Sequence, residues 1–575
     1  MCSSATPRPH VTLAGVALFA CLMTACGASE PLSLPDAGVS PALDARPTDA
    51  APADALPSDS GAQSLDAGAI DSGAPDSGLV LGSTDVLTQS GVVRGAQEGA
   101  LQVFRGIPYA EAPQGNLRWT KPQAPAPWPG TLQTTEFGPD CAQLNNRGRV
   151  TGAEDCLTLN IWTARAATPR PVMVWIHGGG YVQGASSRAI YEGTQLAELG
   201  DVVLVSINYR LGVLGFLATE ALAAERDDHA AGNYGTLDQI HALKWVRDNI
   251  AAFGGDPDNV TIFGESAGGV SVCTMLGAPQ ADGLYHRAII QSGGGCYSLA
   301  RLNGPGTGPS ALDIGIELST EVGCIDAVDP AACLRSLSFE QLTQAMSQLS
   351  GSGLGLPDIG PNVDGVVLPQ QPYARVLAQD SPSVPILIGS NADEAATFVG
   401  AVPVPDRASF ERLVRAAVGA ANASGVIALY PPSEYPDPKQ AYLDAFSDLS
   451  FNCPAQSFAR TAASHAPSYV YYFPHVLTGR LGAEGATHGS EIPFVFGTID
   501  VSPAYQPTAD DRAVSSAMLS AWASFAHTGV PISTPAWPMY VPSDPQFIQF
   551  QAAPSIETDY RLGRCEGLRA LNLVP

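Results

Sequence analysis

The stretch VTIFGESAGG, residues 260–269, decides the fold of this chain. Residues 260–263 are apolar or β-branched and predict a short buried strand that ends at Gly264. A tight turn and a helix follow around Ser266. A serine at such a junction is typical of a nucleophile elbow, in which glycines permit strained dihedral angles and leave room for the side chain. Because the helix directs N–H groups and its positive end at the turn, Ser266 is predicted to be a nucleophile.

A second glycine-rich segment lies upstream of the elbow. The apolar run PVMVWI, residues 171–176, predicts a buried strand that leads directly into HGGG, residues 177–180. A loop of this kind offers backbone N–H groups to an oxyanion. We therefore predict that Gly179 and Gly180 donate to the oxyanion, with the amide of Ala267 as a third donor.

The chain around these two motifs alternates predicted strands with predicted helices. Apolar runs at 201–208, 288–291 and 384–389 indicate further buried strands, and the apolar spacing over 238–253 indicates a helix. This alternation predicts an α/β fold with a large, mostly parallel central β-sheet flanked by helices on both faces.

Several further blocks resemble the type-B carboxylesterase/cholinesterase family, and the resemblance covers residues 84–575. The blocks are FRGIPYA (104–110), EDCL with LN (154–157 and 159–160), HGGG (177–180), NYR (208–210), FGGDP (253–257), GESAGG (264–269) and QSG (291–293). The resemblance implies an α/β-hydrolase fold with helical insertions around an active-site gorge. It also implies a carboxylesterase with a Ser–Glu–His triad.

The resemblance places the other two members of the triad in two loop segments. GSNADE, residues 389–394, implies Glu394 as the acid, with Asp393 as the alternative. THGSEIPF, residues 487–494, implies His488 as the base, and its position before a glycine in a predicted loop suits a positioned base. A structural role is expected for His177, His241 and His475.

These residues together predict a serine carboxylic-ester hydrolase without a cofactor or metal. His488 would take the proton of Ser266 during attack on an ester, and Glu394 would hold the imidazole, so that an acyl-enzyme forms and is then hydrolysed. Glu265 is expected either to tune the local charge or to be a buried structural carboxylate. Lipase, lactone or amide hydrolysis on the same triad, and a non-catalytic surface adhesion module, are the alternatives.

Two departures from the cholinesterase pattern bear on the substrate. The loop between Cys141 and Cys156 contains no aromatic residue, so cation–π recognition of choline lacks its main platform. Residues 351–357 also lack an aromatic ring, which implies a roomier acyl pocket. We expect a broad carboxylesterase acting on small to medium uncharged esters rather than a choline esterase.

The cysteine count is compatible with an exported protein. Three of the eleven cysteines, Cys2, Cys21 and Cys26, belong to the N-terminal segment, and the even remainder suggests disulfides. The resemblance implies the pairs Cys141–Cys156, Cys324–Cys333 and Cys453–Cys565. Cys273 and Cys296 are expected either to form an extra bridge or to be two buried thiols. No pair of cysteines has C-x-x-C spacing and no HExxH motif occurs, so no metal site is expected.

The N-terminal part is expected to be an export signal and a tether. Residues 1–26 combine Arg8, an apolar run and a lipobox-like end at Cys26, which predicts either a lipoprotein signal or a plain secretory signal. Residues 27–83 are rich in Ala, Pro, Ser, Gly and Asp without an aromatic residue, so they are expected to be a disordered tether. Residues 84–575 are expected to form one catalytic domain, exported either as a cell-envelope lipoprotein, expected in the outer membrane, or as a secreted protein.

The charge of the chain excludes one class of partner. With 29 basic and 55 acidic residues the formal net charge is −26, which repels phosphate backbones and disfavours nucleic acid binding. A membrane is expected to be contacted only through the lipid on Cys26.

Overall fold

The structure is a computed structural model that describes residues 82–164, 168–294, 299–304, 306, 308–349, 351 and 358–575. The expected signal segment and nearly all of the expected tether therefore lie outside the described residues. Among the helices described, none is both long enough and apolar enough to span a bilayer.

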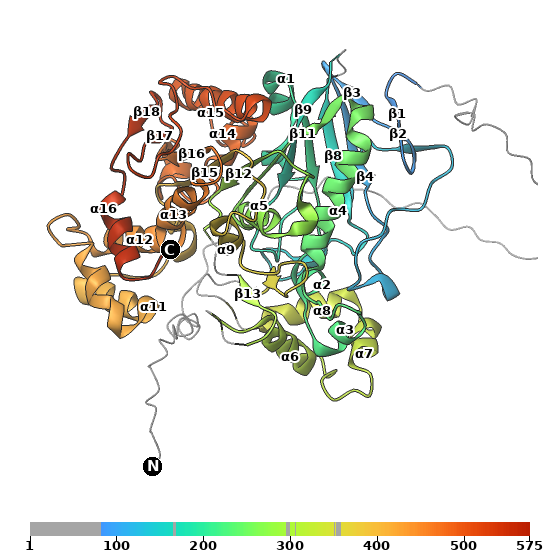
Figure 1. Ribbon diagram of the computed structural model, residues 1–575, viewed down its shortest axis with the longest axis horizontal. Helices are drawn as coiled ribbons and strands as arrows, with labels where there is room; N and C mark the ends of the chain where they lie inside the picture. Colours follow the sequence, from blue (N-terminus) through green and yellow to red (C-terminus); the bar gives the residue numbers. More distant parts are fainter. Residues whose placement is uncertain are drawn as a thin grey trace, which may run out of the picture. The chain divides into compact units, whose positions relative to one another are not determined.

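A large sheet runs through the middle of the described chain (Figure 1). It has eleven strands among the described residues, in the order β18-β17-β16-β15-β12-β11-β9-β10-β8-β4-β3. Their bounds are β3 Ala96–Glu98, β4 Leu101–Pro108, β8 Thr158–Thr163, β9 Arg170–Ile176, β10 Val203–Ile207, β11 Gly255–Glu265, β12 Arg287–Gln291, β15 Ile386–Asn391, β16 Ser468–Phe473, β17 Phe547–Gln549 and β18 Ser555–Glu557. The smaller sheets contain β1 Asp85–Thr88, β2 Gly91–Arg94, β5 Thr131–Gln133, β6 Gln143–Leu144, β7 Val150–Thr151, β13 Ala300–Arg301 and β14 Asn362–Val363.

The central strands of the large sheet are parallel. Every pairing from β10 through β9, β11, β12, β15 and β16 to β17 is parallel, and antiparallel strands occur only toward the two edges. The predicted α/β-hydrolase sheet is therefore confirmed. Because parallel strands end at the same edge, the residues after β9, β11, β12 and β15 lie near one another, and ligand sites form at such an edge.

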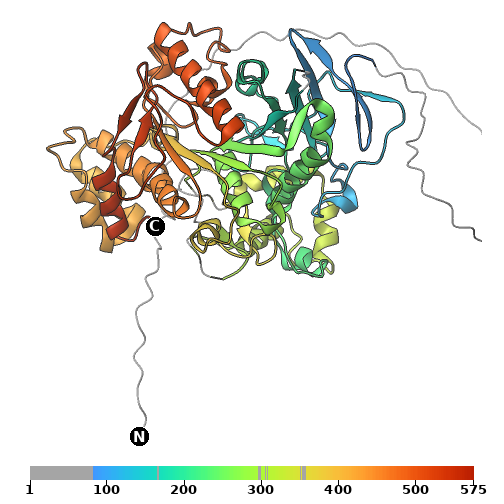
Figure 2. The ribbon, with the colours of Figure 1, turned by 45° about the horizontal axis from the view of Figure 1, so that its top comes forward.

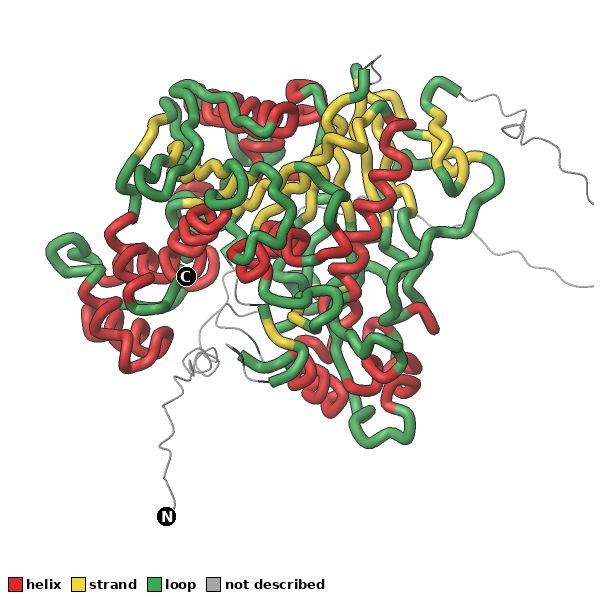
Figure 3. The backbone as a smooth tube through the Cα atoms, in the orientation of Figure 1, coloured by secondary structure: helices red, strands yellow, loops and turns green. Residues whose placement is uncertain are grey.

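Alternate residues of the central strands enter two different cores. On β9, Val172, Val174 and Ile176 pack in one core with α4 and α5, whereas Met173 and Trp175 pack in the other with α1, α14 and α15. This period of two covers both faces of the sheet with helices. Figure 2 shows helices above and below the sheet, and Figure 3 shows the strands between the helices.

The described helices comprise those that cover the sheet and those of the insertions. They are α1 Thr194–Gly200, α2 Gly212–Phe216, α3 Glu220–Ala224, α4 Tyr234–Asn249, α5 Ala267–Gly277, α6 Ala311–Glu321, α7 Pro330–Ser336, α8 Phe339–Ala345, α9 Pro372–Leu377, α10 Ala396–Val399, α11 Arg407–Ala428, α12 Pro438–Ser447, α13 Cys453–Ala462, α14 Ile492–Phe496, α15 Ala509–Thr528 and α16 Leu562–Ala570. Helices α11, α12 and α16 share a separate apolar core and lie together in Figure 1.

The boundaries of several elements differ from the sequence expectation. The strand expected from 384 begins at Ile386, because Pro385 has no N–H to donate to the ladder. The helix expected over 238–253 begins four residues earlier, at Tyr234, and its last four residues form a 3₁₀ turn. The strand before the elbow is longer than expected and starts at Gly255.

Three disulfides join parts of the described chain. Cys141–Cys156, Cys324–Cys333 and Cys453–Cys565 are formed, as the resemblance implies. The first closes a loop that contains the β6–β7 hairpin, and the last joins α13 to α16 across 112 residues of sequence. Cys273 is disulfide-bonded as well, so the alternative of two buried thiols is wrong, while Cys296 lies outside the described residues.

Candidate active site

The turn at Ser266 is the strained junction that the sequence predicts. Strand β11 ends at Glu265, Ser266 has φ 57° and ψ −124°, and α5 begins at Ala267. A non-glycine residue in such a conformation costs on the order of 1–3 kcal/mol, so the surroundings must enforce it. The N–H of Ser266 donates to the carbonyl of Gln291 at 2.9 Å, which ties the turn to the end of β12.

The glycine loop after β9 lies directly against this turn. Gly179 and Gly180 have φ of 112° and 63°, conformations that favour glycine. A Cβ on Gly178 would lie 3.0 Å from the Cβ of Ser266, so the loop passes beside the serine. Among the described residues, no hydrogen bond uses the N–H groups of Gly179, Gly180 or Ala267. The three amides therefore remain available as hydrogen-bond donors.

Glu394 and His488 are brought together at the same edge of the sheet. The Nδ1 atom of His488 lies 2.5 Å from Oε2 of Glu394, although the residues are 94 positions apart. Glu394 is fully buried, and its other oxygen accepts from Ser292 Oγ at 2.6 Å and from the N–H of Asn391 at 2.8 Å. These hydrogen bonds fix the orientation of the Glu394 carboxylate toward the imidazole.

Glu265 lies on the other side of the imidazole. Its Oε1 atom is 3.1 Å from Nε2 of His488, and both atoms are buried without a hydrogen-bond partner in the described chain. Burial raises the pKa of Glu265 to about 8. Burial alone would lower the pKa of His488, but the charges of Glu265 and Glu394 outweigh it and raise that pKa to about 9. The two groups are so close that the protonation state of each changes the pKa of the other.

A third buried carboxylate, Glu491, was not singled out from the sequence. It accepts from Gln291 Nε2 at 3.0 Å and from Asn391 Nδ2 at 2.6 Å, and burial raises its pKa. Trp522 of α15 donates to the other end of the Gln291 amide at 3.0 Å. A signal was available, since Glu491 follows His488 by three residues in the same loop.

Two phenylalanines enclose the imidazole and were also missed. The rings of Phe398 and Phe451 each lie 4.9 Å from the ring of His488, centroid to centroid, and stack on each other at 5.7 Å. They come from α10 and from the π-helical turn before α13, so no local pattern joins them. The aromatic walls restrict the movement of the imidazole.

The remaining titratable candidates lie elsewhere. The Asp393 carboxylate accepts from the N–H of Ala486 instead of approaching His488. His475 contacts Asp511 at 2.7 Å, and His177 is buried with its ring stacked on Tyr209. His241 packs near Tyr109. In the described part of the chain, no three or more His, Cys, Asp or Glu residues form a group that could hold a metal ion.

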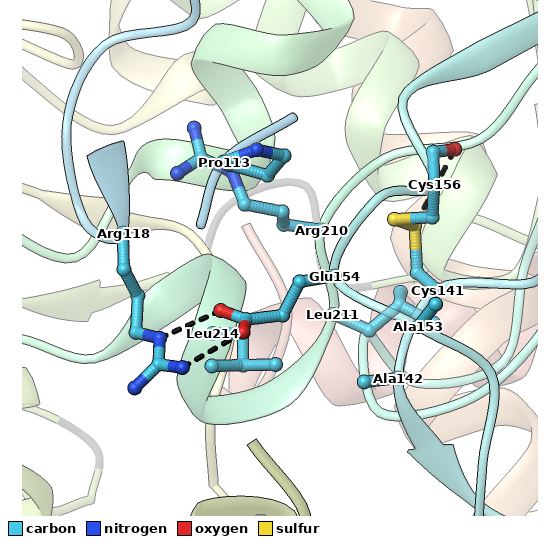
Figure 4. A pocket seen from close by; sticks show the side chains of 10 residues that line it. All are labelled: Pro113, Arg118, Cys141, Ala142, Ala153, Glu154, Cys156, Arg210, Leu211 and Leu214. Atoms are coloured by element: carbon cyan, nitrogen blue, oxygen red, sulfur yellow. Dashed lines mark hydrogen bonds and ion pairs between the residues drawn. A yellow bond between two sulfur atoms is a disulfide. The ribbon is translucent and has the colours of Figure 1, made fainter. Parts of the chain in front are cut away.

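A small enclosed cavity beside the first disulfide is structural in character. Arg118 donates to both oxygens of Glu154 at 2.6 and 2.7 Å beside the Cys141–Cys156 bridge (Figure 4). The cavity measures about 10 Å³, roughly enough for a single water molecule. A substrate does not fit there.

The fold and the site define an α/β hydrolase with a buried acid–imidazole pair at a strand–turn–helix junction. The chain matches the carboxylesterase family over residues 82–567, and it therefore belongs to that family. It is 35% identical to a para-nitrobenzyl esterase of Bacillus subtilis (strain 168), with 82% of this chain and 96% of the relative covered. It is also 35% identical to a fumonisin B1 esterase of Sphingopyxis macrogoltabida, over 77% of this chain and 82% of that relative.

Solved structures agree with this assignment. The chain superposes on a thermophilic PNB esterase with a TM-score of 0.74 at 32% identity, covering 84% of this chain and 99% of that one. The protein is an enzyme of the carboxylic ester hydrolase class.

Proposed function

We propose that this protein hydrolyses carboxylic esters through Ser266, His488 and Glu394. The observation that carries the proposal is the buried Glu394–His488 contact of 2.5 Å, with Nε2 of His488 3.1 Å from the carboxylate of Glu265, the residue that precedes Ser266. Loop segments that are distant in sequence converge here, which is what a serine–histidine–acid mechanism requires.

The arrangement supports a two-step mechanism. Nε2 of His488 takes the proton of Ser266 as its Oγ attacks the ester carbonyl, and Glu394 stabilises the imidazolium through Nδ1. The amides of Gly179, Gly180 and Ala267 bind the oxyanion that develops. His488 then protonates the leaving alcohol, and water repeats the sequence on the acyl-enzyme. In this scheme Glu265 acts on the charge of His488 and does not contact the carbonyl.

We infer that the ester is small to medium and uncharged around the bond that breaks. Glu265 and Glu394 lie on either side of the imidazole and Glu491 is buried nearby, and the burial that raises the pKa of Glu265 and Glu491 disfavours a further negative charge in this site. The relatives named for para-nitrobenzyl and fumonisin B1 esters support ester hydrolysis over lactone, amide or triacylglycerol cleavage. A non-catalytic adhesion role has no support in a chain that keeps all three residues.

Replacing the nucleophile tests the proposal. Ser266→Ala should lower kcat for p-nitrophenyl butyrate by at least about 10⁴-fold, because no other group supplies the attacking oxygen. The exposed Ser347→Ala is the matched control and should keep full activity. A serine-reactive phosphonate should label the parent and the control but not Ser266→Ala. Ester turnover retained by Ser266→Ala would refute the assignment.

We further propose that choline esters are poor substrates. The loop closed by Cys141–Cys156 carries no aromatic ring that could face a quaternary ammonium group. The corresponding expectation for residues 351–357 falls on residues that the structure does not describe, except Gly351. Acetylthiocholine should be hydrolysed much more slowly than p-nitrophenyl butyrate, and equal rates would contradict this proposal.

We also propose that the enzyme is exported and attached through Cys26 by a tether ending near residue 83. Three disulfides in the described chain are consistent with an oxidising compartment. Mass spectrometry of the mature N-terminus tests the anchor: an acylated Cys26 is expected. An unmodified N-terminus at another residue would indicate secretion without a lipid anchor.

A further inference from the structure

A cavity of about 420 Å³ lies outside the glycine loop and takes no part in the mechanism above. It is formed between the β6–β7 hairpin and the segment that follows the HGGG loop. Its lining is polar except for one leucine: Asp140, Gln143, Leu144, Asn145, Asn146, Arg147, Thr151, Gln183 and Arg188. A volume of this size holds part of a small molecule.

The cavity carries positive charge in an otherwise acidic protein. Arg147 and Arg188 are exposed, and the ion pairs of the described residues include neither of them. The one acidic residue of the lining, Asp140, already accepts from Ser187 Oγ at 2.8 Å. The lining therefore contains two arginines without an ion-pair partner among the described residues and one aspartate.

The turn that carries Arg147 is ordered. Oδ1 of Asn145 accepts from the N–H groups of Arg147 and Arg149 at 2.9 and 3.1 Å. The Gln143 side chain joins the hairpin to the opposite wall through two hydrogen bonds to the backbone of Gly184. Its Nε2 donates to the Gly184 carbonyl at 2.9 Å, and its Oε1 accepts from the Gly184 N–H at 2.9 Å. The two walls of the cavity are thus held together.

This cavity shares a wall with the oxyanion loop. The N–H of Gln183, a lining residue, donates to the carbonyl of Gly179 at 3.1 Å. The charge of Arg188 reaches His177 at the start of the glycine loop, where burial and this charge together lower the pKa of the imidazole to about 4. The cavity is therefore separated from the predicted oxyanion donors by a single turn of chain.

We propose that this cavity binds a carboxylate at the far end of the ester substrate, through Arg147 and Arg188. The inference rests on the proposed ester hydrolysis and narrows its substrate class to half-esters: neutral at the bond that breaks and negative at the distal end. Guanidinium groups suit carboxylates because they donate two parallel hydrogen bonds.

The negative charge of the whole protein does not prevent this. At physiological ionic strength charges are screened over about 8 Å, so an anion inside the cavity responds mainly to the arginines beside it. The burial of the groups around His488 disfavours a negative group at the reaction centre, whereas the arginines would accept one at the distal end. Together the two regions would favour ester substrates whose negative charge lies far from the bond that breaks.

Matched substrates that differ only in charge test the proposal. The acyl arm compares mono-p-nitrophenyl adipate and suberate with the p-nitrophenyl esters of the corresponding monoamides. The alcohol arm compares 6-butyryloxyhexanoate with its primary amide. Each is assayed with the parent enzyme, Arg147→Gln, Arg188→Gln and Arg149→Gln, the last being the matched control on the same turn but outside the cavity lining.

We expect Arg147→Gln and Arg188→Gln each to lower kcat/KM for the carboxylate esters of one arm by roughly tenfold, the effect of one charge-assisted hydrogen bond. Their activity on the amides, and that of Arg149→Gln on every substrate, should stay unchanged. The preference of the parent enzyme for carboxylate over amide should weaken in 0.5 M NaCl. Equal losses on charged and neutral esters, or no loss on either arm, would overturn the proposal. If the parent enzyme showed no Ser266-dependent hydrolysis of the neutral esters, ester hydrolysis itself would be refuted instead.

Discussion

At the scale of single residues, the charge of Glu265 governs the pH at which His488, the proposed base, loses its proton. The pKa of His488 is raised to about 9, so the imidazole is largely protonated at pH 7 and becomes competent as the pH rises toward 9. Glu265 contributes to this because its carboxylate lies 3.1 Å from Nε2. The same carboxylate can stabilise the imidazolium that forms after proton transfer.

Removing the Glu265 charge should therefore move the pH profile. In Glu265→Gln the imidazole loses one anionic neighbour, its pKa falls, and the rising limb of kcat/KM shifts to lower pH by at least roughly one unit. The measurement is kcat/KM for p-nitrophenyl butyrate between pH 5.5 and 10. The exposed Glu340→Gln is the control and should leave the profile in place. An identical profile for Glu265→Gln would show that this carboxylate does not act on His488.

We propose that Ser292 positions Glu394, the proposed acid. Its Oγ donates to Glu394 at 2.6 Å inside a fully buried environment. Ser292→Ala should lower kcat by about 10- to 100-fold, the worth of one hydrogen bond to a charged group, with KM little changed. Steady-state kinetics and thermal unfolding should be measured together. A loss of activity that tracks a loss of folded protein would contradict the positioning role.

At the scale of elements, the elbow depends on the close approach of α5 to β9. A Cβ on Gly268 would lie 2.0 Å from the carbonyl oxygen of Ile176, so the first turn of α5 touches the end of the strand that carries the glycine loop. The approach brings the serine turn next to the loop that carries the predicted oxyanion amides. It also explains why a glycine follows so soon after Ser266.

Gly268→Ala should separate these two elements. We expect a loss of about 3 kcal/mol or more in the free energy of unfolding, since backbone atoms must move to admit the methyl group. Gly563→Ala in α16 is the control, because a Cβ there meets nothing within 4 Å. Urea unfolding followed by circular dichroism measures both variants. Equal stability for the two would contradict the packing argument.

At the scale of the whole molecule, the disulfides differ in how much chain they close. Cys453–Cys565 spans 112 residues, whereas Cys324–Cys333 spans nine. The longer bridge joins α13, beside the π-helical turn with Phe451, to the C-terminal helix α16. It therefore connects the C-terminal helix to the wall of the candidate active site.

Loop length should set the stability that each bridge contributes. In the chain-entropy account, replacing Cys453 and Cys565 together by alanine costs about 5 kcal/mol, against about 2.5 kcal/mol for Cys324 and Cys333. Denaturant unfolding of the two double variants tests the order. A larger loss for the short bridge would indicate that native-state packing, and not the closed loop, governs the effect.

Sequence alone determined the features whose causes are local. The elbow and the glycine loop follow from short stretches in which strand, turn and helix signals are adjacent, and the alternation of such signals specified the parallel sheet. Glu394 and His488 came from the family resemblance, since no spacing rule joins residues 94 positions apart.

Only the tertiary structure decided what surrounds the imidazole. Ser292, Glu491, Phe398 and Phe451 come from different elements, and only the common edge of the sheet brings them together. Nothing in the sequence singles out the arginines of the outer cavity. Whether they are available to a ligand depends on whether a carboxylate lies close enough to pair with them. Local propensity acts over a few residues, whereas burial, pKa and the charge of a cavity depend on neighbours that only the folded chain supplies.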